Sequence, residues 1–315
     1  MAVLALDLGG TKLASAVFSQ DGNMRGKTMA HLRGRSGSEV GALISEQVHH
    51  AITQERHEEI EAIGISVPGI YHARTGTVWA PNIPGWTDYP LVEELTTRTG
   101  GLLVRVDSDR ACSILGETWR GSAQGCRNAV FVAVGTGIGA GILVDGTVLR
   151  GHSDIAGATG WMALESCFRP EYAGCGCFEF HASGSGLAHR TREMLDEDPA
   201  YSGTLRSIPA DDLTTEHVFA AALEGDPLAT HVIARAITYW GMATANYVSL
   251  FDPEMIIFGG GVFGPAARFL DRIRQEAARW AQPISMRRVK LTCSALGPDA
   301  ALYGAGRLAL NAGNT

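Results

Sequence analysis

The sequence predicts an α/β protein in which glycine-rich turns end buried strands at three places. The first is the run LALDLGGTKLASAV at residues 4–17, where an apolar strand carries one acid, breaks at two glycines and resumes as a second strand. The second is AVFVAVGTGIGAGI at 129–142, and the third is the strand 255–258 followed by the glycines at 259–261. Around them, apolar strands alternate with segments of helical spacing. This alternation indicates open α/β sheets that bind ligands beyond their strand ends.

The order of the elements predicts two domains. Helical spacing is expected over 39–53, 89–99, 110–119, 228–248 and 300–310, and further strands over 62–67 and 102–106. The strand 102–106 delivers Asp107, Ser108 and Asp109 to the start of the next helix, a position that faces ligands in such sheets. We place the first domain at 1–113 plus 300–315, because the last helix could cross back onto it, and the second at 114–299.

The paired glycine hairpins predict a phosphate-binding site. Glycines without a Cβ let backbone N–H groups approach an anion closely, Thr11 and Lys12 add a hydroxyl and a positive charge, and Asp7 can hold a hydrated magnesium ion. The alternative for one such run is an ordinary hairpin with glycines at its tip. The duplication favours a nucleotide site, and its predicted residues are Asp7, Gly9, Gly10, Thr11, Lys12, Gly135, Thr136, Gly137, Gly139, Gly259, Gly260 and Gly261.

Composition narrows the class of protein. The 315 residues are 45% hydrophobic and 19% charged, with a net charge of −7, which argues against non-specific binding to nucleic acid. No apolar run reaches the roughly 20 residues of a membrane helix, and no basic region precedes the first strand. We therefore expect a cytoplasmic protein with no membrane partner, whose six cysteines are reduced thiols or metal ligands. Whether it forms a homodimer is left open.

Six ordered motifs together resemble the ROK family of sugar kinases and repressors, within the actin, hexokinase and sugar-kinase superfamily. They are DLGGTK at 7–12, GISVPG at 64–69, APNIPGW at 80–86, Ser108-Asp109 with LGE at 115–117, GTGIG at 135–139 and GGG at 259–261. The resemblance covers nearly the whole chain. It implies an α/β fold of two ribonuclease-H-like domains with an interdomain active-site cleft that holds ATP, magnesium and a sugar and closes when sugar binds.

The resemblance also assigns roles to individual residues. It makes Asp109 the catalytic base that takes the proton from the attacking sugar hydroxyl, with Ser108 standing where the family has asparagine. The alternative for Asp109 is a helix N-cap. The substrate-binding residues that it implies are Ser66, Pro68, Gly69, Asn82, Ser108, Asp109, Ala158, Trp161 and Glu179.

Two of these positions depart from the family pattern. Ala158 stands where the family has a glutamate that contacts the sugar near its anomeric end, and Trp161 stands where it has a histidine that touches sugar and binds zinc. The indole of Trp161 offers either a face on which a ring could stack or an ordinary core-packing group. The family's zinc loop is also shortened. Cys167, Cys175 and Cys177, with His152 or His181, could form an irregular site, but we expect no regular zinc.

These observations predict an ATP-dependent kinase that phosphorylates the primary (6-)hydroxyl of a hexose-like substrate other than ordinary glucose. The resemblance implies an amino sugar such as kanosamine, which family members phosphorylate at the primary hydroxyl, and Glu179 or another nearby carboxylate could accept its ammonium group. The alternatives are a C7-cyclitol kinase, a glucose kinase, or a non-catalytic ROK-type sugar sensor. A repressor is disfavoured, because the first hairpin begins at residue 3 and leaves no room ahead of it for a DNA-binding domain.

Overall fold

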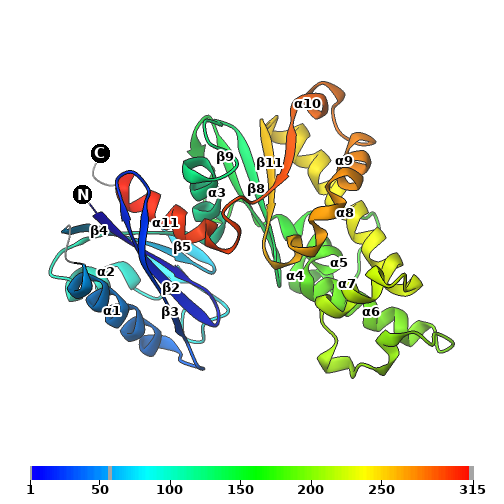
Figure 1. Cartoon of the computed structure of the whole chain (residues 1–315), viewed down its shortest axis with the longest axis horizontal. Coiled ribbons are helices and arrows are strands. Elements are labelled where there is room, and N and C mark those ends of the chain that lie inside the picture. Colours follow the sequence, from blue (N-terminus) through cyan, green and yellow to red (C-terminus); the bar gives the residue numbers. More distant parts are fainter. Residues whose placement is uncertain (1, 56–58, 312–315) are drawn as a thin grey trace. The chain divides into compact units, whose positions relative to one another are not determined.

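The computed structural model describes residues 2–55 and 59–311, and the chain divides into two compact units (Figure 1). The first unit comprises Met1–Gly125, Thr147–Ala156 and Ser294–Thr315, and the second comprises Cys126–Gly146 and Gly157–Cys293. The domain boundary predicted from motif order, between residues 113 and 114, stays a prediction.

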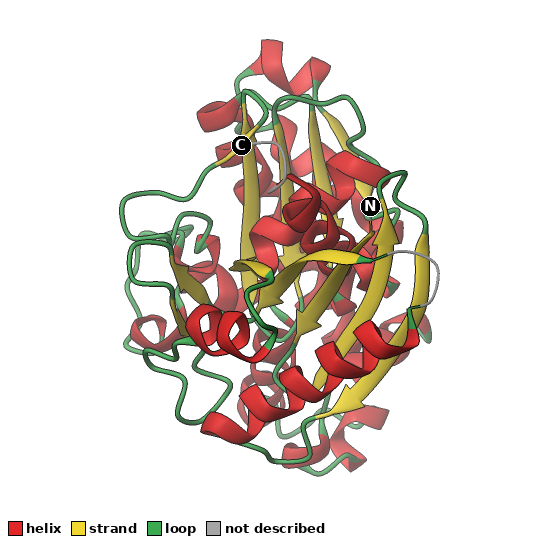
Figure 2. Cartoon of the chain, turned by 90° about the vertical axis from the view of Figure 1, so that its left-hand side faces the viewer, coloured by secondary structure: helices red, strands yellow, loops and turns green. Residues whose placement is uncertain are grey.

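A five-stranded sheet forms the centre of the first unit, in the order β3-β2-β1-β4-β7. Its strands are β1 (Ala2–Leu8), β2 (Lys12–Ser19), β3 (Met24–His31), β4 (Ile60–Val67) and β7 (Leu103–Ser108). The first three are antiparallel, while β4 and β7 run parallel to β1. Figure 2 shows the strands as arrows with helices on their faces. The parallel strands bring the ends of β1, β4 and β7 to one edge of the sheet.

Helices cover both faces of this sheet, and β1 shows why. Leu4 and Leu6 pack in the cluster that holds α1 (Gly37–Gln54) and α2 (Leu91–Arg98), whereas Val3 and Ala5 pack with α3 (Asp109–Arg120) and α11 (Ala300–Asn311). Successive side chains of a strand point to opposite faces, so an almost continuous apolar strand needs a layer on each side. The expected helices at 39–53, 89–99, 110–119 and 300–310 are confirmed, with ends that differ by at most two residues. A small hairpin of β5 (Ile70–His72) and β6 (Thr77–Trp79) and the 3₁₀ turn η6 (Gly297–Asp299) complete the described unit.

Glycines let α3 and α11 pack unusually closely. A Cβ on Gly304 would overlap the carbonyl oxygen of Cys112, and one on Gly116 would overlap that of Ala300. Gly116 is therefore explained by helix packing.

We predict that Gly304→Ala destabilises the protein by about 1 to 3 kcal/mol, because the two helices must separate to admit the methyl group. An unobstructed helical glycine behaves in the opposite way, since alanine is the better helix former by about 1 kcal/mol. Gly174→Ala, where nothing lies within 4 Å of the added carbon, is the matched control. Urea unfolding of both variants checks this, and equal midpoints for Gly304→Ala and wild type would contradict it.

The second unit repeats the sheet pattern of the first. Its strands β8 (Ala129–Val134), β9 (Ile138–Val144), β11 (Met255–Gly259) and β12 (Lys290–Cys293) lie in the order β9-β8-β11-β12, which reproduces the second to fifth positions of the first sheet. β9 is antiparallel to β8, and β11 runs parallel to both β8 and β12. The short β10 (Thr147–Val148) follows β9 in sequence and belongs to the segment 147–156 of the first unit.

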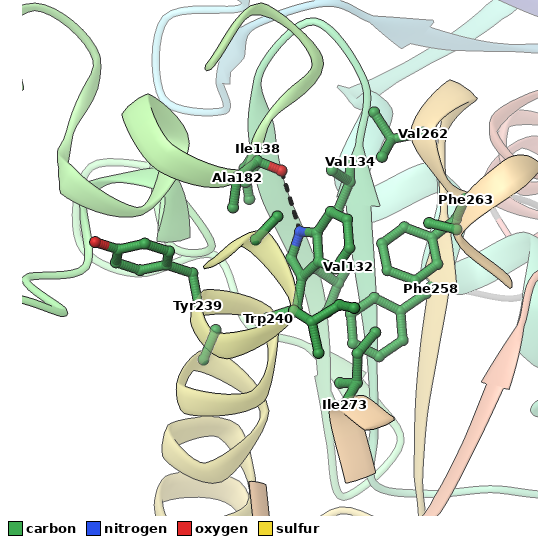
Figure 3. Packing of buried hydrophobic residues seen from close by; sticks show 14 of the residues in the cluster. Val132, Val134, Ile138, Ala182, Tyr239, Trp240, Phe258, Val262, Phe263 and Ile273 are labelled. Atoms are coloured by element: carbon green, nitrogen blue, oxygen red, sulfur yellow. Dashed lines mark hydrogen bonds between the residues drawn. The ribbon is translucent and has the colours of Figure 1, made fainter. Parts of the chain in front are cut away.

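Helices of the second unit build its core around α8 (Pro227–Phe251). Trp240 of α8 packs against Phe263, which stacks on Phe258 of β11, and its indole Nε1 donates to the carbonyl oxygen of Ala182 over 3.1 Å (Figure 3).

The other helices are α4 (Tyr172–Cys175), α5 (Cys177–Ala182), α6 (Gly184–Glu197), α7 (Thr215–Leu223), α9 (Leu270–Ala278) and α10 (Pro283–Arg288). The 3₁₀ turns are η1 (Thr159–Trp161), η2 (Thr204–Ser207), η3 (Ala210–Asp212), η4 (Gly261–Phe263) and η5 (Pro265–Phe269). Among the described helices, none has the length and apolar character needed to span a bilayer.

Candidate active site

Polar side chains meet at the edge of the first sheet where its parallel strands end. Asp7 of β1 lies opposite Ser66 of β4, and Ser66 lies opposite Asp107 of β7. The hydroxyl of Ser66 donates to Asp7 Oδ1 over 2.7 Å. Burial raises the pKa of Asp7 to about 6, the Ser66 hydrogen bond opposes this, and the negative charge of Asp109 adds to it. The site therefore concentrates negative charge that a cation would relieve.

Both carboxylate oxygens of Asp107 have partners within the protein. Its Oδ1 accepts from the backbone N–H of Ser108 over 2.8 Å, and its Oδ2 pairs with Arg150 Nη2 over 2.6 Å. Burial raises the pKa of Asp107, and the Arg150 guanidinium opposes that rise. The pair ties the segment 147–156 to the sheet, which gives Asp107 a structural role.

Asp109 is the carboxylate at this edge that remains accessible. The N-cap of α3 is Ser108, whose Oγ accepts from the N–H of Ala111 over 3.3 Å, so the helix-cap alternative for Asp109 is wrong. Asp109 Oδ1 accepts from the N–H of Arg110 over 2.8 Å, and its side chain is 49% exposed. Desolvation by the surrounding protein raises the pKa of Asp109, and the charge of Arg110 partly offsets this.

The first glycine hairpin joins β1 to β2 beside this acidic edge. The N–H of Gly9 donates to the carbonyl oxygen of Lys12 over 2.8 Å and closes the turn, while Thr11 and Lys12 are exposed. A Cβ on Gly10 would lie 3.4 Å from Cβ of Asn82, so two predicted site residues from distant motifs are neighbours. A Cβ on Gly69 would instead overlap the backbone of Trp79, which explains that glycine by packing.

The second glycine hairpin is built around Glu179. Glu179 Oε2 accepts from the N–H of Ile138 over 2.6 Å, and a Cβ on Gly137 would lie 2.6 Å from the same oxygen. Burial raises the pKa of Glu179, and the Ile138 hydrogen bond opposes the shift. Position 137 therefore needs a glycine, because Glu179, the predicted sugar-binding carboxylate, fills the space that a side chain would take. Sequence reasoning assigned Gly137 to the nucleotide and did not predict this contact.

The turn η1 lies against Glu179 from the other side. A Cβ on Gly160 would lie 3.0 Å from both Cβ and Oε2 of Glu179, and Gly176, at φ +88°, leaves room for the backbone of Trp161. Ala158 is partly buried, whereas Trp161 is 57% exposed. The core-packing alternative for Trp161 is therefore wrong. The structure groups Gly137, Glu179 and the 158–161 turn into one local site in the second unit.

The third glycine run contains glycines of two kinds. A Cβ on Gly259 would overlap the ring of Phe131, and Gly260, at φ +87°, would meet the backbone of Val134. Both are explained by packing. Gly261 and Gly135 have nothing within 4 Å of the position that a Cβ would take, so that neither is required by its neighbours within the fold.

The carboxylate oxygens at the acidic edge of the first sheet are of the kind that magnesium takes as ligands. Burial is the main cause of the raised pKa of Asp7 and the negative charge of Asp109 adds to it, so a hard divalent cation at this carboxylate would stabilise its ionised form. Among residues 2–55 and 59–311, no three His, Cys, Asp or Glu side chains form a group that could hold a metal ion. Cys167 is exposed, Cys177 is buried, and His181 bonds to Tyr172. His152 belongs to the first unit, in the segment 147–156.

Sequence reasoning missed a polar cluster that includes His181 of the helix that carries Glu179. Its other members are Glu165, Tyr172, Arg235 and Tyr239. These residues come from a loop and three helices, and no short motif contains them. Arg150 was missed in the same way. Only the folded chain brings such residues together.

The two α/β sheets and their glycine hairpins define a protein of the actin and hexokinase fold, and comparison with known proteins agrees. The ROK family model matches residues 3–312. A glucokinase from Halalkalibacterium halodurans is 31% identical over 97% of this chain and 94% of its own length. The crystal structure of a ROK hexokinase from Thermus thermophilus matches with a TM-score of 0.83 and 30% identity over 100% of both chains. A ROK glucokinase from Streptomyces griseus, solved with glucose and AMPPNP, matches with a TM-score of 0.77 and 28% identity over 99% of this chain and 100% of that one.

The chain belongs to the ROK family. The predicted two-domain α/β fold is confirmed.

Proposed function

We propose that this protein is an ATP-dependent sugar kinase that transfers the γ-phosphate to the primary hydroxyl of a hexose-like substrate. The observation that carries the proposal is Asp109. It is a half-exposed carboxylate at the edge of the sheet where the parallel strands end. Ser108 and not Asp109 caps α3. The contact of Asp109 with Arg110 Nε, at 3.9 Å, is longer than the 2.6 Å pair of Asp107 with Arg150. Because its pKa is raised, the ionised Asp109 carboxylate is a stronger base than that of an ordinary aspartate.

The other residues have supporting roles in the proposal. Asp109 accepts the proton of the sugar hydroxyl as that oxygen attacks, while Asn82 and Glu179 orient the ring. The N–H groups of the two glycine hairpins and the ammonium of Lys12 stabilise negative charge on the phosphates. Asp7, held by Ser66, would hold magnesium, which when bound neutralises charge on the transferred phosphoryl group.

For the acceptor we propose an amino hexose such as kanosamine. Ala158 provides no side-chain hydrogen bond, and Trp161, next to the Gly160 that lies against Glu179, has an exposed indole that offers a ring face. Glu179 would pair with the ammonium group. A C7 cyclitol is the second candidate, because it has no anomeric centre and so would not need hydrogen bonds from positions 158 and 161. Glucose is the alternative substrate that an experiment must exclude, since the relatives compared above include glucokinases.

A coupled assay of ADP release over a panel of acceptors tests the proposal. The panel contains kanosamine, glucosamine, N-acetylmannosamine, glucose, a β-glucoside and a C7 cyclitol, each with ATP and magnesium. We expect sugar-dependent ADP release with at least one of them. Calorimetric binding of a sugar without ADP release from any acceptor would instead favour the non-catalytic sensor.

The open glycines predict how nucleotide binding can be tested separately from sugar binding. We expect Gly135→Ala to raise the KM for ATP several-fold and to leave the KM for sugar unchanged. The added methyl group contacts no protein atom, so it can obstruct only a bound ligand. Gly174→Ala, equally open and in the same unit, is the control. Gly137→Val is unsuitable, since its side chain would displace Glu179. An unchanged KM for ATP in Gly135→Ala would remove Gly135 from the nucleotide site.

A further inference from the structure

The helix that carries Glu179 is too short to hold its own position. α5 spans the six residues Cys177–Ala182, and a helix of this length gains little from its own hydrogen bonds. Tertiary contacts must therefore fix the position of α5. One is the hydrogen bond from the Trp240 indole to the carbonyl oxygen of Ala182. A second is made by a group of side chains that we name the Glu165 cluster, which consists of Glu165, Tyr172, His181, Arg235 and Tyr239.

Both oxygens of Glu165 are used within this cluster. The hydroxyl of Tyr172 donates to Oε2 over 2.8 Å, and Oε1 accepts from the hydroxyl of Tyr239 and, over 3.2 Å, from Arg235 Nη2. Burial alone would raise the pKa of Glu165, but the hydrogen bonds from Tyr239 and Tyr172 outweigh it, so the pKa is lowered. The carboxylate stays ionised and accepts from all three donors.

His181 connects this carboxylate to α5. Its Nε2 lies 2.7 Å from the hydroxyl oxygen of Tyr172, and its ring stacks on that of Tyr239 at 4.4 Å with an interplanar angle of 5°. Because the single hydroxyl proton of Tyr172 goes to Glu165, Nε2 must carry the proton and donate to Tyr172. Burial lowers the pKa of His181 to about 4, so the ring is neutral near pH 7.

The cluster therefore joins three parts of the second unit: the loop that carries Glu165, the α4–α5 segment, and α8. His181 is two residues from Glu179 on α5, and Arg169 of the same loop stacks over the ring of Phe180, 4.7 Å from its centre. Glu165 is therefore linked to α5 through His181, two residues after Glu179.

We propose that the Glu165 cluster is a positioning device that holds the Glu179 carboxylate at the sugar site, with Glu165 and Tyr172 acting through His181 rather than by touching substrate. This inference rests on the proposed function of Glu179. It predicts that loosening the cluster weakens sugar binding and leaves nucleotide binding and the chemical step intact, because Asp109 and the open glycines lie outside it.

The test is the kinetics of Tyr172→Phe, which removes the hydroxyl and keeps the ring. We expect the KM for the sugar to rise about fivefold, the effect of losing roughly one hydrogen bond, with kcat and the KM for ATP unchanged. Tyr201→Phe is the matched control. It breaks another tyrosine–carboxylate bond of the same unit, from Tyr201 to Asp226 over 2.6 Å, at a place not joined to α5. Equal sugar KM values for Tyr172→Phe and wild type would overturn the proposal.

A double-mutant cycle shows whether the effect passes through Glu179. If it does, Tyr172→Phe should add little to the sugar KM of Glu179→Gln, so that the two effects are strongly non-additive. Full additivity would mean that the cluster stabilises the unit without positioning Glu179, and would also overturn the proposal. Failure of the proposed function is recognised separately, because wild-type protein would then show no sugar-dependent ADP release.

Discussion

Asp109→Asn should lower kcat at least about 100-fold while leaving sugar binding and the fold unchanged. The amide keeps the size of the side chain but cannot take a proton, and a positioned base is commonly worth 10²- to 10⁴-fold in rate. The helix start should survive, because the capping oxygen belongs to Ser108. Steady-state ADP release gives kcat, and calorimetry gives sugar affinity.

The control for this prediction is Asp21→Asn, an exposed aspartate in the turn between β2 and β3 of the same unit, which should behave as wild type. The pH profile adds a second observation. Since protonation removes the base, and the pKa of Asp109 is raised above 3.8, activity should fall with decreasing pH from above the range of an ordinary aspartate. Turnover near wild type in Asp109→Asn would exclude Asp109 as the base.

Glucose should be a poorer substrate than the best amino hexose or cyclitol by at least about tenfold in kcat/KM. Ala158 cannot hydrogen-bond a hydroxyl, and the indole of Trp161 has one donor where an imidazole has two nitrogens. A buried anomeric hydroxyl without a partner costs about 1 to 3 kcal/mol, which corresponds to roughly tenfold or more. A cyclitol has no such hydroxyl, and an amino hexose, which keeps it, gains the pairing of its ammonium group with Glu179.

The double variant Ala158→Glu with Trp161→His should shift this preference toward glucose. Each single variant is its control, and thermal unfolding shows whether either change disturbs η1. Because Trp161 is exposed, loss of the indole should cost little stability. Preference of the wild-type enzyme for glucose over every amino sugar and cyclitol in the panel would show that these two substitutions have been misinterpreted.

Much of this fold could be predicted because its signals are local. The strand before Gly9 and the helix after Ser108 are set by hydrophobic period and turn residues within a few positions, and both lie where the sequence indicates. The duplicated hairpins gave the class of fold for the same reason. The capping role of Ser108, by contrast, depends on which oxygen reaches Ala111, a geometry that residue types alone do not decide.

The parts that could not be predicted depend on contacts between distant residues. Nothing near Gly137 in the sequence indicates that Glu179 fills the space a side chain would need. The same holds for Glu165, whose partner Tyr239 lies 74 positions away. Among the glycines, the sequence does not separate Gly259, needed by the ring of Phe131, from Gly261, which is open.

The most direct test of the account is identification of the product by phosphorus and proton NMR, after wild-type protein has acted on ATP, magnesium and its best acceptor. We predict a monophosphate ester at the primary hydroxyl, formed in equal amount to ADP, and no product from the 6-deoxy analogue of that acceptor. Phosphorylation at the anomeric hydroxyl, or ADP release that is equally fast with the 6-deoxy analogue, would contradict the assignment of Asp109 as the base for the primary hydroxyl.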